Sequence, residues 1–283
     1  MSGSMSGRIC VVTGATRGIG RATAQGLAKL GATVVVICRR REDGDALASE
    51  IAASAPVKPD VVTVDLSSQN SIREAARQLR EHYPHLHVLI NNAGIITPRR
   101  ELSVDGIEMQ FAVNHLAYFL LTLLLLDRLK AGAPSRVINV TSGAHAGASL
   151  DFDDLQNERR YEPNRAYAQS KLANILFTYE LARRLSGTGV TANCLHPGVI
   201  ATGLLADYMR IPIAGPTLAR TFGATPEEGA ETSIYLASSP QVERETGKYF
   251  VGLKARDSSR QSYDEATARR LWEASERITG LAS

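Results

Sequence analysis

Short apolar runs alternate along this chain with longer segments of helical periodicity. The runs are rich in β-branched residues and predict strands over Arg8–Thr13, Thr33–Cys38, Val61–Val64, Val88–Ile90, Arg136–Val140, Val190–Leu195 and Tyr249–Val251. The segments between them predict helices over Arg21–Leu30, Glu42–Ala53, Ser71–Tyr83, Val104–Leu129, Ala166–Leu185 and Pro226–Ala237. Near-continuous apolar strands joined by helices are typical of a parallel sheet that is buried on both faces. We therefore predict an α/β fold with a doubly wound parallel sheet and helices on both faces.

Length and composition fit one globular domain. The chain has 283 residues, of which 44% are hydrophobic and 22% charged, so wholesale disorder is excluded. Its net charge is +3, and it has no dense basic block with interleaved aromatic residues, so we expect no nucleic acid partner. We expect residues 1–7 to form a flexible tail and residues 8–283 to form a single catalytic domain.

The sequence also bears on the cellular compartment. Three scattered cysteines, Cys10, Cys38 and Cys194, are too few for a disulfide framework and favour the reducing cytoplasm. The first seven residues do not resemble a signal peptide. The most apolar stretch, Leu116–Leu126, has 11 residues, whereas a membrane span needs about 20, so we expect no transmembrane segment.

A glycine-rich segment, TGATRGIG, follows the first predicted strand and opens a helix. Glycines there allow a tight turn and a close approach to a pyrophosphate, whose charge is stabilised by the helix N-terminus. The alternative is an ordinary glycine-rich turn. Its position at the first strand-to-helix turn favours a Rossmann-type dinucleotide site. The candidate residues are Gly14, Thr16, Arg17, Gly18, Ile19 and Gly20.

The end of the second strand bears on which dinucleotide binds. A carboxylate there would accept hydrogen bonds from a free ribose 2′-hydroxyl, but this chain has Arg39, followed by Arg40 and Arg41. Guanidinium groups form paired, charge-assisted hydrogen bonds with phosphate. We therefore predict that Arg39 and Arg17 select NADP(H) over NAD(H). Arg40 and Arg41 can alternatively belong to a solvated basic turn.

Tyr167 and Lys171 lie four positions apart on a predicted helix and therefore share one face. A tyrosine of pKa ~10 is a poor acid–base group at neutral pH. A nearby ammonium favours the phenolate and moves the pKa toward the useful range. Because this spacing is common in helices, an exposed pair without a role is the alternative.

Together with Asn114 and Ser142, these motifs resemble the short-chain dehydrogenase/reductase family. The resemblance covers nearly the whole chain, in TGATRGIG, Asp65-Leu66, Asn91-Asn92-Ala93-Gly94, Asn114, Ser142, Tyr167 with Lys171, and Pro197-Gly198 with Thr202. It implies hydride transfer at a carbonyl or carbinol carbon, with the hydride supplied by the cofactor. Tyr167 would be the general acid in reduction and the base in oxidation.

The resemblance also assigns roles to the other residues. Ser142 would hold the substrate oxygen, Lys171 would hold the nicotinamide ribose and lower the pKa of Tyr167, and Asn114 would anchor a proton-relaying water. The remaining cofactor contacts would come from Asp65 and Leu66 at the adenine, from Asn92, Ala93 and Gly94 at the adenosine side, and from Pro197, Gly198, Ile200 and Thr202 near the nicotinamide carboxamide.

The second half of the chain is similar to the retinol dehydrogenase-type branch, in stretches such as YAQSKLANILFTYELARRL and GVTANCLHPGVIAT. That branch typically uses NADPH on apolar aldehydes and ketones, including retinal. Many of its members have an N-terminal apolar anchor that this sequence lacks, which favours broad carbonyl specificity. Leu204, Leu205 and Tyr208 would form part of an apolar substrate lid, or alternatively pack at the sheet edge or on a second subunit.

Several alternatives stay open. The helices Val104–Leu129 and Ala166–Leu185 carry more apolar surface than a sheet face needs, so a homo-oligomer is expected. We expect no metal, because no Cys or carboxylate pattern completes a site around His82, His85 and His87. A non-catalytic NADP(H)-binding redox sensor and an epimerase or dehydratase of the extended short-chain type are the rival functions.

Overall fold

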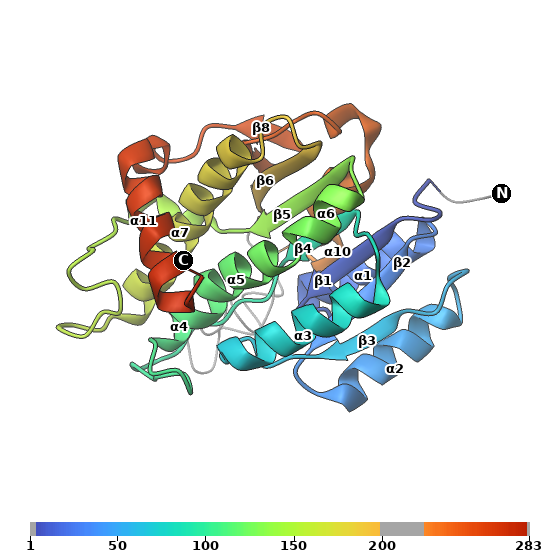
Figure 1. The fold of residues 1–283 in the computed structure, drawn as a ribbon, viewed down its shortest axis with the longest axis horizontal. Coiled ribbons are helices and arrows are strands. Elements are labelled where there is room, and N and C mark those ends of the chain that lie inside the picture. The colour runs from blue at the N-terminus through green and yellow to red at the C-terminus, as the bar shows by residue number, and fades with distance from the viewer. Residues whose placement is uncertain (1–3, 199–223, 282–283) are drawn as a thin grey trace.

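The computed structural model describes residues 4–198 and 224–281. Its eight strands form one sheet in the order β3-β2-β1-β4-β5-β6-β7-β8 (Figure 1). The strands are β1 (Ile9–Thr13), β2 (Thr33–Cys38), β3 (Asp60–Thr63), β4 (Val88–Asn91), β5 (Ser135–Val140), β6 (Val190–His196), β7 (Tyr249–Val251) and β8 (Lys254–Arg256). All neighbours pair in parallel except β7 and β8, which are antiparallel. The predicted doubly wound parallel sheet is confirmed.

Helices cover both faces of the sheet because successive strand residues point to opposite sides. On one side, Val11 of β1 packs in the core with α3 (Gln69–His82), α5 (Ala117–Leu124) and α7 (Pro163–Arg184). On the other, its neighbours Cys10 and Val12 pack with α1 (Gly18–Lys29), α2 (Arg41–Ala52) and α10 (Pro226–Ser238). All three cysteines are buried and unpaired.

The predicted helix Val104–Leu129 begins later than expected and is broken. A turn closes between the N–H of Ser103 and the carbonyl of Ile107 at 2.7 Å. Glu108 then caps the helix, because its carboxylate accepts from the N–H groups of Gln110 and Phe111. The helical path continues through α4 (Met109–Phe111), a π-helical turn η1 (Ala112–Leu116), α5 and α6 (Leu126–Ala131).

The sequence pattern missed the C-terminal helix α11 (Glu265–Thr279), which packs on α7 (Figure 1). Trp272 of α11 lies edge-on to Phe119, with 5.0 Å between ring centroids, and it also contacts Phe177. At the other end of the chain, Met5 is buried and its N–H donates to the carbonyl of Leu30 at 2.9 Å. The packed part of the chain therefore begins within the predicted N-terminal tail.

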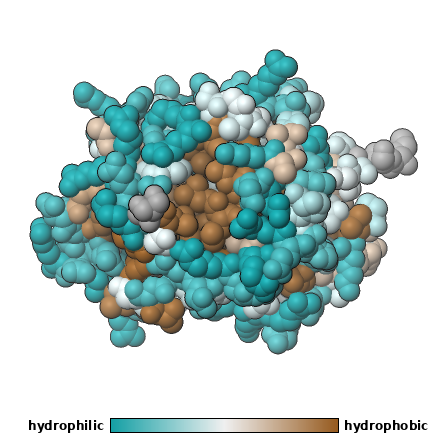
Figure 2. Space-filling model, viewed as in Figure 1, coloured by the Kyte–Doolittle hydropathy of each residue, from teal (hydrophilic) through white to brown (hydrophobic). Residues whose placement is uncertain are grey.

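The position of α11 changes the argument for self-association. Part of the apolar surface of α7 is covered by α11 of the same chain. Figure 2 shows an apolar area near the middle of the view. Leu123, Leu124 and Leu126 of α5 and α6 are only partly buried. Homo-oligomer formation therefore stays a prediction, and the exposed apolar surface that supports it is smaller than the sequence indicated. No helix in the described part of the chain combines the length and apolar content needed to cross a membrane.

Candidate active site

The predicted site residues gather at the carboxyl edge of the sheet, near the point where the strand order reverses between β1 and β4. The glycine-rich segment follows β1, and Asn92 to Gly94 follow β4. Ser142 comes just after β5, and Pro197 and Gly198 come just after β6. This edge is where open α/β sheets bind their ligands.

The turn after β1 requires glycine at three positions. Gly14 and Gly18 have φ of +63° and +51°, in the left-handed region that other residues rarely adopt. A Cβ atom on Gly20 would lie 2.3 Å from the carbonyl oxygen of Gly14 and 2.5 Å from Nδ2 of Asn92. Helix α1 therefore starts tight against the turn, with room only for a hydrogen atom at Gly20.

Thr13 joins this turn to the turn after β4, a role that sequence analysis missed. Its hydroxyl accepts from the N–H groups of Asn92 at 2.9 Å and Ala93 at 3.1 Å, and donates to the carbonyl of Ile90. The side-chain amide of Asn92 donates to the carbonyl of Thr13 at 2.8 Å. The only sequence signal was the position of Thr13 directly before the first glycine of the motif.

The start of α1 can accept an anion. The N-cap residue, Arg17, makes no side-chain capping bond, and the first-turn N–H groups from Gly18 to Gly20 have no acceptor within the helix. Within residues 4–198 and 224–281, the guanidinium groups of Arg17 and Arg39 have no hydrogen-bond or ion-pair partner, and both residues are exposed. These groups fit the phosphates of a dinucleotide.

Arg39 differs from its two neighbours in its ion pairing. Arg40 forms an ion pair with Asp43 at 2.7 Å, and Arg41 forms one with Asp45 at 3.0 Å. Both therefore belong to the basic turn at the start of α2, and of the three only Arg39 has no partner among the described residues. After β3, Asp65 is exposed and its carboxylate accepts from Ser67, while Leu66 packs against the core.

Lys171 is buried on α7, with 2% of its surface exposed. Its Nζ donates to the carbonyl of Val140 at 3.2 Å and lies 5.5 Å from the centroid of the Tyr167 ring. Burial lowers the pKa of Lys171 to about 8, so the amine is mostly protonated at neutral pH. The ammonium therefore places a positive charge beside Tyr167, which is also buried.

Asn114 lies on the π-helical turn η1 and is fully buried. Its Oδ1 accepts from the N–H of Ile95 at 2.8 Å, and its Nδ2 donates to the carbonyl of Ile95 and to Oγ of Ser170, each at 3.0 Å. A Cβ atom on Gly94 would lie 3.3 Å from Nζ of Lys171 and 3.6 Å from Oδ1 of Asn114. Gly94 therefore lies next to both the amide of Asn114 and the ammonium of Lys171.

Ser142 is the N-cap of a short 3₁₀ turn, η2 (Gly143–Gly147), which packs against α7. Its Oγ accepts from the N–H of Ala144 at 3.2 Å, which leaves the hydroxyl hydrogen available to a substrate. His145 holds the same residue through its main chain, with Nδ1 2.7 Å from the carbonyl of Ser142. The other ring nitrogen of His145 accepts from the N–H of Ser259 at 3.1 Å, which fixes the tautomer.

The remaining predicted residues lie outside the described part of the chain. These are Ile200 and Thr202 of the cofactor set and Leu204, Leu205 and Tyr208 of the substrate set. Pro197 and Gly198 are the last residues described before this segment, and Gly198 has a φ of +93°.

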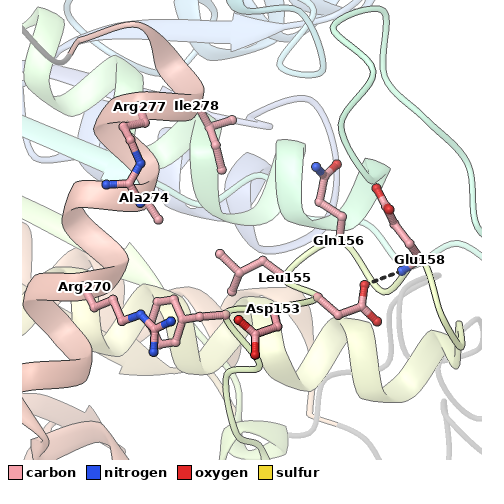
Figure 3. Close-up of a pocket in the computed structure, with 10 residues that line it drawn as sticks. Asp153, Leu155, Gln156, Glu158, Arg270, Ala274, Arg277 and Ile278 are labelled. Carbon is pink, nitrogen blue, oxygen red and sulfur yellow. Dashed lines mark hydrogen bonds between the residues drawn. The ribbon is translucent and has the colours of Figure 1, made fainter.

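A surface cavity of about 330 Å³ lies elsewhere, between residues 152–158 and α11 (Figure 3). Leu155, Ala274 and Ile278 form its apolar part, and Arg270 lies over the Phe152 ring at 4.2 Å. None of the predicted catalytic or cofactor residues lines it. Among the described residues, no group of three or more His, Cys, Asp or Glu side chains could hold a metal ion.

Comparison with known proteins assigns the family. The model of the short chain dehydrogenase family matches residues 8–210. The chain belongs to the short-chain dehydrogenase family. It is 45% identical to human retinol dehydrogenase 14, over 99% of this chain and 88% of the relative. It is 44% identical to human retinol dehydrogenase 13, over 98% of this chain and 86% of the relative. This short-chain dehydrogenase is therefore an oxidoreductase of the retinol dehydrogenase branch, as the motifs predicted.

Solved structures agree with the assignment. A protein from Mycobacterium paratuberculosis superposes with a TM-score of 0.79 at 35% identity, over 97% of this chain and 94% of that chain. The complex of Pseudomonas aeruginosa RhlG with NADP superposes with a TM-score of 0.72 at 29% identity, over 88% of this chain and 96% of that chain. The Rossmann-type fold of this short-chain dehydrogenase is thus shared with a relative that binds NADP.

Proposed function

We propose that this protein is an NADP(H)-dependent oxidoreductase that interconverts apolar aldehydes or ketones and their alcohols. The observation that carries the proposal is the arrangement around Lys171. One buried ammonium lies beside the ring of Tyr167 and, like the amide of Asn114, next to Gly94. Such a group of buried polar residues at the carboxyl edge of the sheet suits a proton transfer coupled to hydride transfer.

Each residue of the set has a distinct part in the reduction. NADPH, when bound, supplies the hydride that reaches the carbonyl carbon of the substrate. Tyr167 donates its phenolic proton to the carbonyl oxygen, and the free hydrogen of the Ser142 hydroxyl holds that oxygen by a hydrogen bond. The charge of Lys171 stabilises the phenolate left on Tyr167. In the oxidation direction the phenolate accepts the proton of the alcohol.

The nucleotide preference rests on charge. The guanidinium groups of Arg39 and Arg17 would bind the ribose 2′-phosphate, since both are exposed and neither is neutralised by a carboxylate of the described residues. The first turn of α1 would hold the pyrophosphate. The RhlG complex contains NADP, which supports the same choice here.

An apolar carbonyl substrate is supported by the relatives, whose names specify retinol dehydrogenases. We propose retinal as one substrate within a broader class of apolar carbonyl compounds. A cytoplasmic location is proposed from the three buried, unpaired cysteines.

The test is NADPH oxidation with a panel of aliphatic and aromatic aldehydes, ketones and retinal. We expect turnover with apolar carbonyls, and a Tyr167→Phe variant whose kcat falls by on the order of 1,000-fold, because general acids contribute about 10²–10⁴-fold. NADPH affinity, measured by fluorescence, shows whether the variant still binds the cofactor. No turnover with any carbonyl, or a fully active Tyr167→Phe variant, would overturn the proposal.

A further inference from the structure

A chain of buried hydrogen bonds connects the C-terminal helix α11 to the turn that bears Asn114. Oγ of Ser275 on α11 lies 3.0 Å from Nε2 of His115. Nδ1 of His115 lies 3.3 Å from Oδ1 of Asn174 on α7. Nδ2 of Asn174 donates to the main-chain carbonyl of Asn114 at 2.8 Å. All four residues are completely buried, at 0% exposure.

The chemistry of these groups fixes the direction of the two bonds made by Asn174. The amide nitrogen of Asn174 must face the carbonyl of Asn114, because two oxygens cannot share a hydrogen bond there. Oδ1 of Asn174 therefore faces His115, and since it can only accept, Nδ1 of His115 must carry the hydrogen. Burial lowers the pKa of His115 to about 4, so the ring is neutral and its Nε2 is an acceptor. The donor that faces Nε2 is the hydroxyl of Ser275, whose Oγ also lies 2.8 Å from the carbonyl of Leu271, so its one hydrogen is shared between these two acceptors.

His115 thus donates to Asn174, and Asn174 donates to Asn114. Ser275 of α11 contacts the other ring nitrogen of His115. The bond to Asn114 falls on a π-helical turn, where the main-chain ladder departs from the regular α-helical pattern. A buried polar group without a partner costs roughly 1–3 kcal/mol of stability, so these hydrogen bonds have little freedom to rearrange. The main chain of Asn114 is therefore held from one side by Asn174, while its side chain is held from the other by Ile95 and Ser170.

We propose that Asn174, oriented by His115 and Ser275, is a positioning residue that sets the place of Asn114 beside Lys171. This inference rests on the proposed function, because it assumes that Asn114 takes part in the reaction. It makes α11 part of the support of the active site, although α11 contributes no residue to the predicted catalytic set.

The first test is a double-mutant cycle on carbonyl reduction. We expect Asn174→Ala to lower kcat by on the order of 10-fold with little change in KM, because small displacements of reacting groups are costly. In an Asn114→Ala background the same substitution should change kcat less than about 2-fold, since the group it positions is gone. Additive effects of the two substitutions would overturn the proposal.

The matched control is Asn193→Ala. Asn193 is also a buried asparagine whose amide bonds to main-chain groups, namely the carbonyl of Glu245 at 2.6 Å and the N–H of Lys248 at 3.0 Å. We expect it to lower the melting temperature to an extent similar to Asn174→Ala and to leave kcat unchanged. An equal loss of kcat in both variants would show a general effect of stability and contradict the positioning role.

A second measurement does not need turnover. Nitrogen-15 NMR of the His115 ring should show the neutral tautomer with hydrogen on Nδ1, and Ser275→Ala should shift the Nε2 resonance. This result supports the chain of bonds even if the parent protein reduces no carbonyl, an outcome that would count against the proposed function alone. A ring with hydrogen on Nε2 would overturn the inferred direction and with it the role of Asn174.

Discussion

The proposed nucleotide side and the proposed reaction side of this site differ in the groups that form them. On the nucleotide side, Gly14, Gly18 and Gly20 shape the main chain, and the unpaired Arg17 and Arg39 are exposed. On the reaction side, Asn114 and Lys171 are buried side chains held by specific hydrogen bonds. Substitutions on the first side should therefore change cofactor affinity, whereas substitutions on the second should change kcat.

The largest effect after loss of Tyr167 is expected at Ser142. Ser142→Ala removes the hydroxyl proposed to hold the substrate oxygen, and losing one such donor typically costs about 10²–10³ in kcat. NADPH affinity should stay within about 2-fold of the parent. Steady-state kinetics and cofactor titration check both expectations.

The control for this substitution is Ser68→Ala. Ser68 is likewise a capping serine, whose Oγ accepts from the N–H of Ser71 at 3.3 Å at the start of α3. Both variants should lose on the order of 1 kcal/mol of stability with the cap. If Ser68→Ala lowered kcat as much as Ser142→Ala, the loss would be one of stability and not of substrate binding.

The next largest effect is expected for a substitution of Gly20 on the nucleotide side, and it concerns the affinity for NADPH. In Gly20→Ala the new methyl group must displace the carbonyl of Gly14 or the amide of Asn92. Overpacking of this kind costs about 1–3 kcal/mol, so we expect NADPH to bind roughly 100-fold more weakly. In Gly26→Ala on the same helix, the new methyl meets the end of the Ile234 side chain, which can move. Equal NADPH affinity in the two variants would contradict the tight turn.

A smaller effect on NADPH binding is expected for Arg39 and not for Arg40. A hydrogen bond to a charged group contributes about 1.5–3 kcal/mol, so Arg39→Gln should weaken NADPH binding roughly 10- to 100-fold and leave NADH binding nearly unchanged. Arg40→Gln removes the same charge from an arginine already paired with Asp43 and should have little effect. A parent enzyme that prefers NADH, or equal losses in the two variants, would refute the assignment of the 2′-phosphate to Arg39.

The smallest expected effect is the dependence of stability on pH. Burial lowers the pKa of His115 from 6.5 to about 4, so the unfolded chain binds a proton that the folded chain does not bind between these values. The contribution of His115 to stability is therefore complete above about pH 6.5 and falls as the pH decreases, by roughly 1 kcal/mol between pH 7 and pH 5.5. Urea unfolding at several pH values measures this, and His115→Gln should make the profile less steep, with the remaining slope due in part to His87, whose pKa burial also lowers to about 4. A parent profile that stays flat down to pH 5 would contradict a buried, neutral His115.

The two sides also differed in how far the sequence predicted them. Gly14, Gly18 and Arg39 were identified because their roles depend on local spacing after a strand. The chain from Ser275 to Asn114 could not be predicted, because His115 and Ser275 are separated by 160 positions and meet only through tertiary packing. The late start of the helix at Met109 was missed for a related reason, since the capping role of Glu108 depends on its burial.

The central claim is hydride transfer from NADPH to a carbonyl carbon, and isotope labelling tests it most directly. The parent enzyme would be supplied with NADPH carrying deuterium at the transferable position of C4, together with an aldehyde that it turns over. The account predicts one deuterium atom on the carbinol carbon of each alcohol molecule formed, as measured by mass spectrometry and proton NMR. An alcohol without deuterium, or NADPH consumption without alcohol, would contradict it.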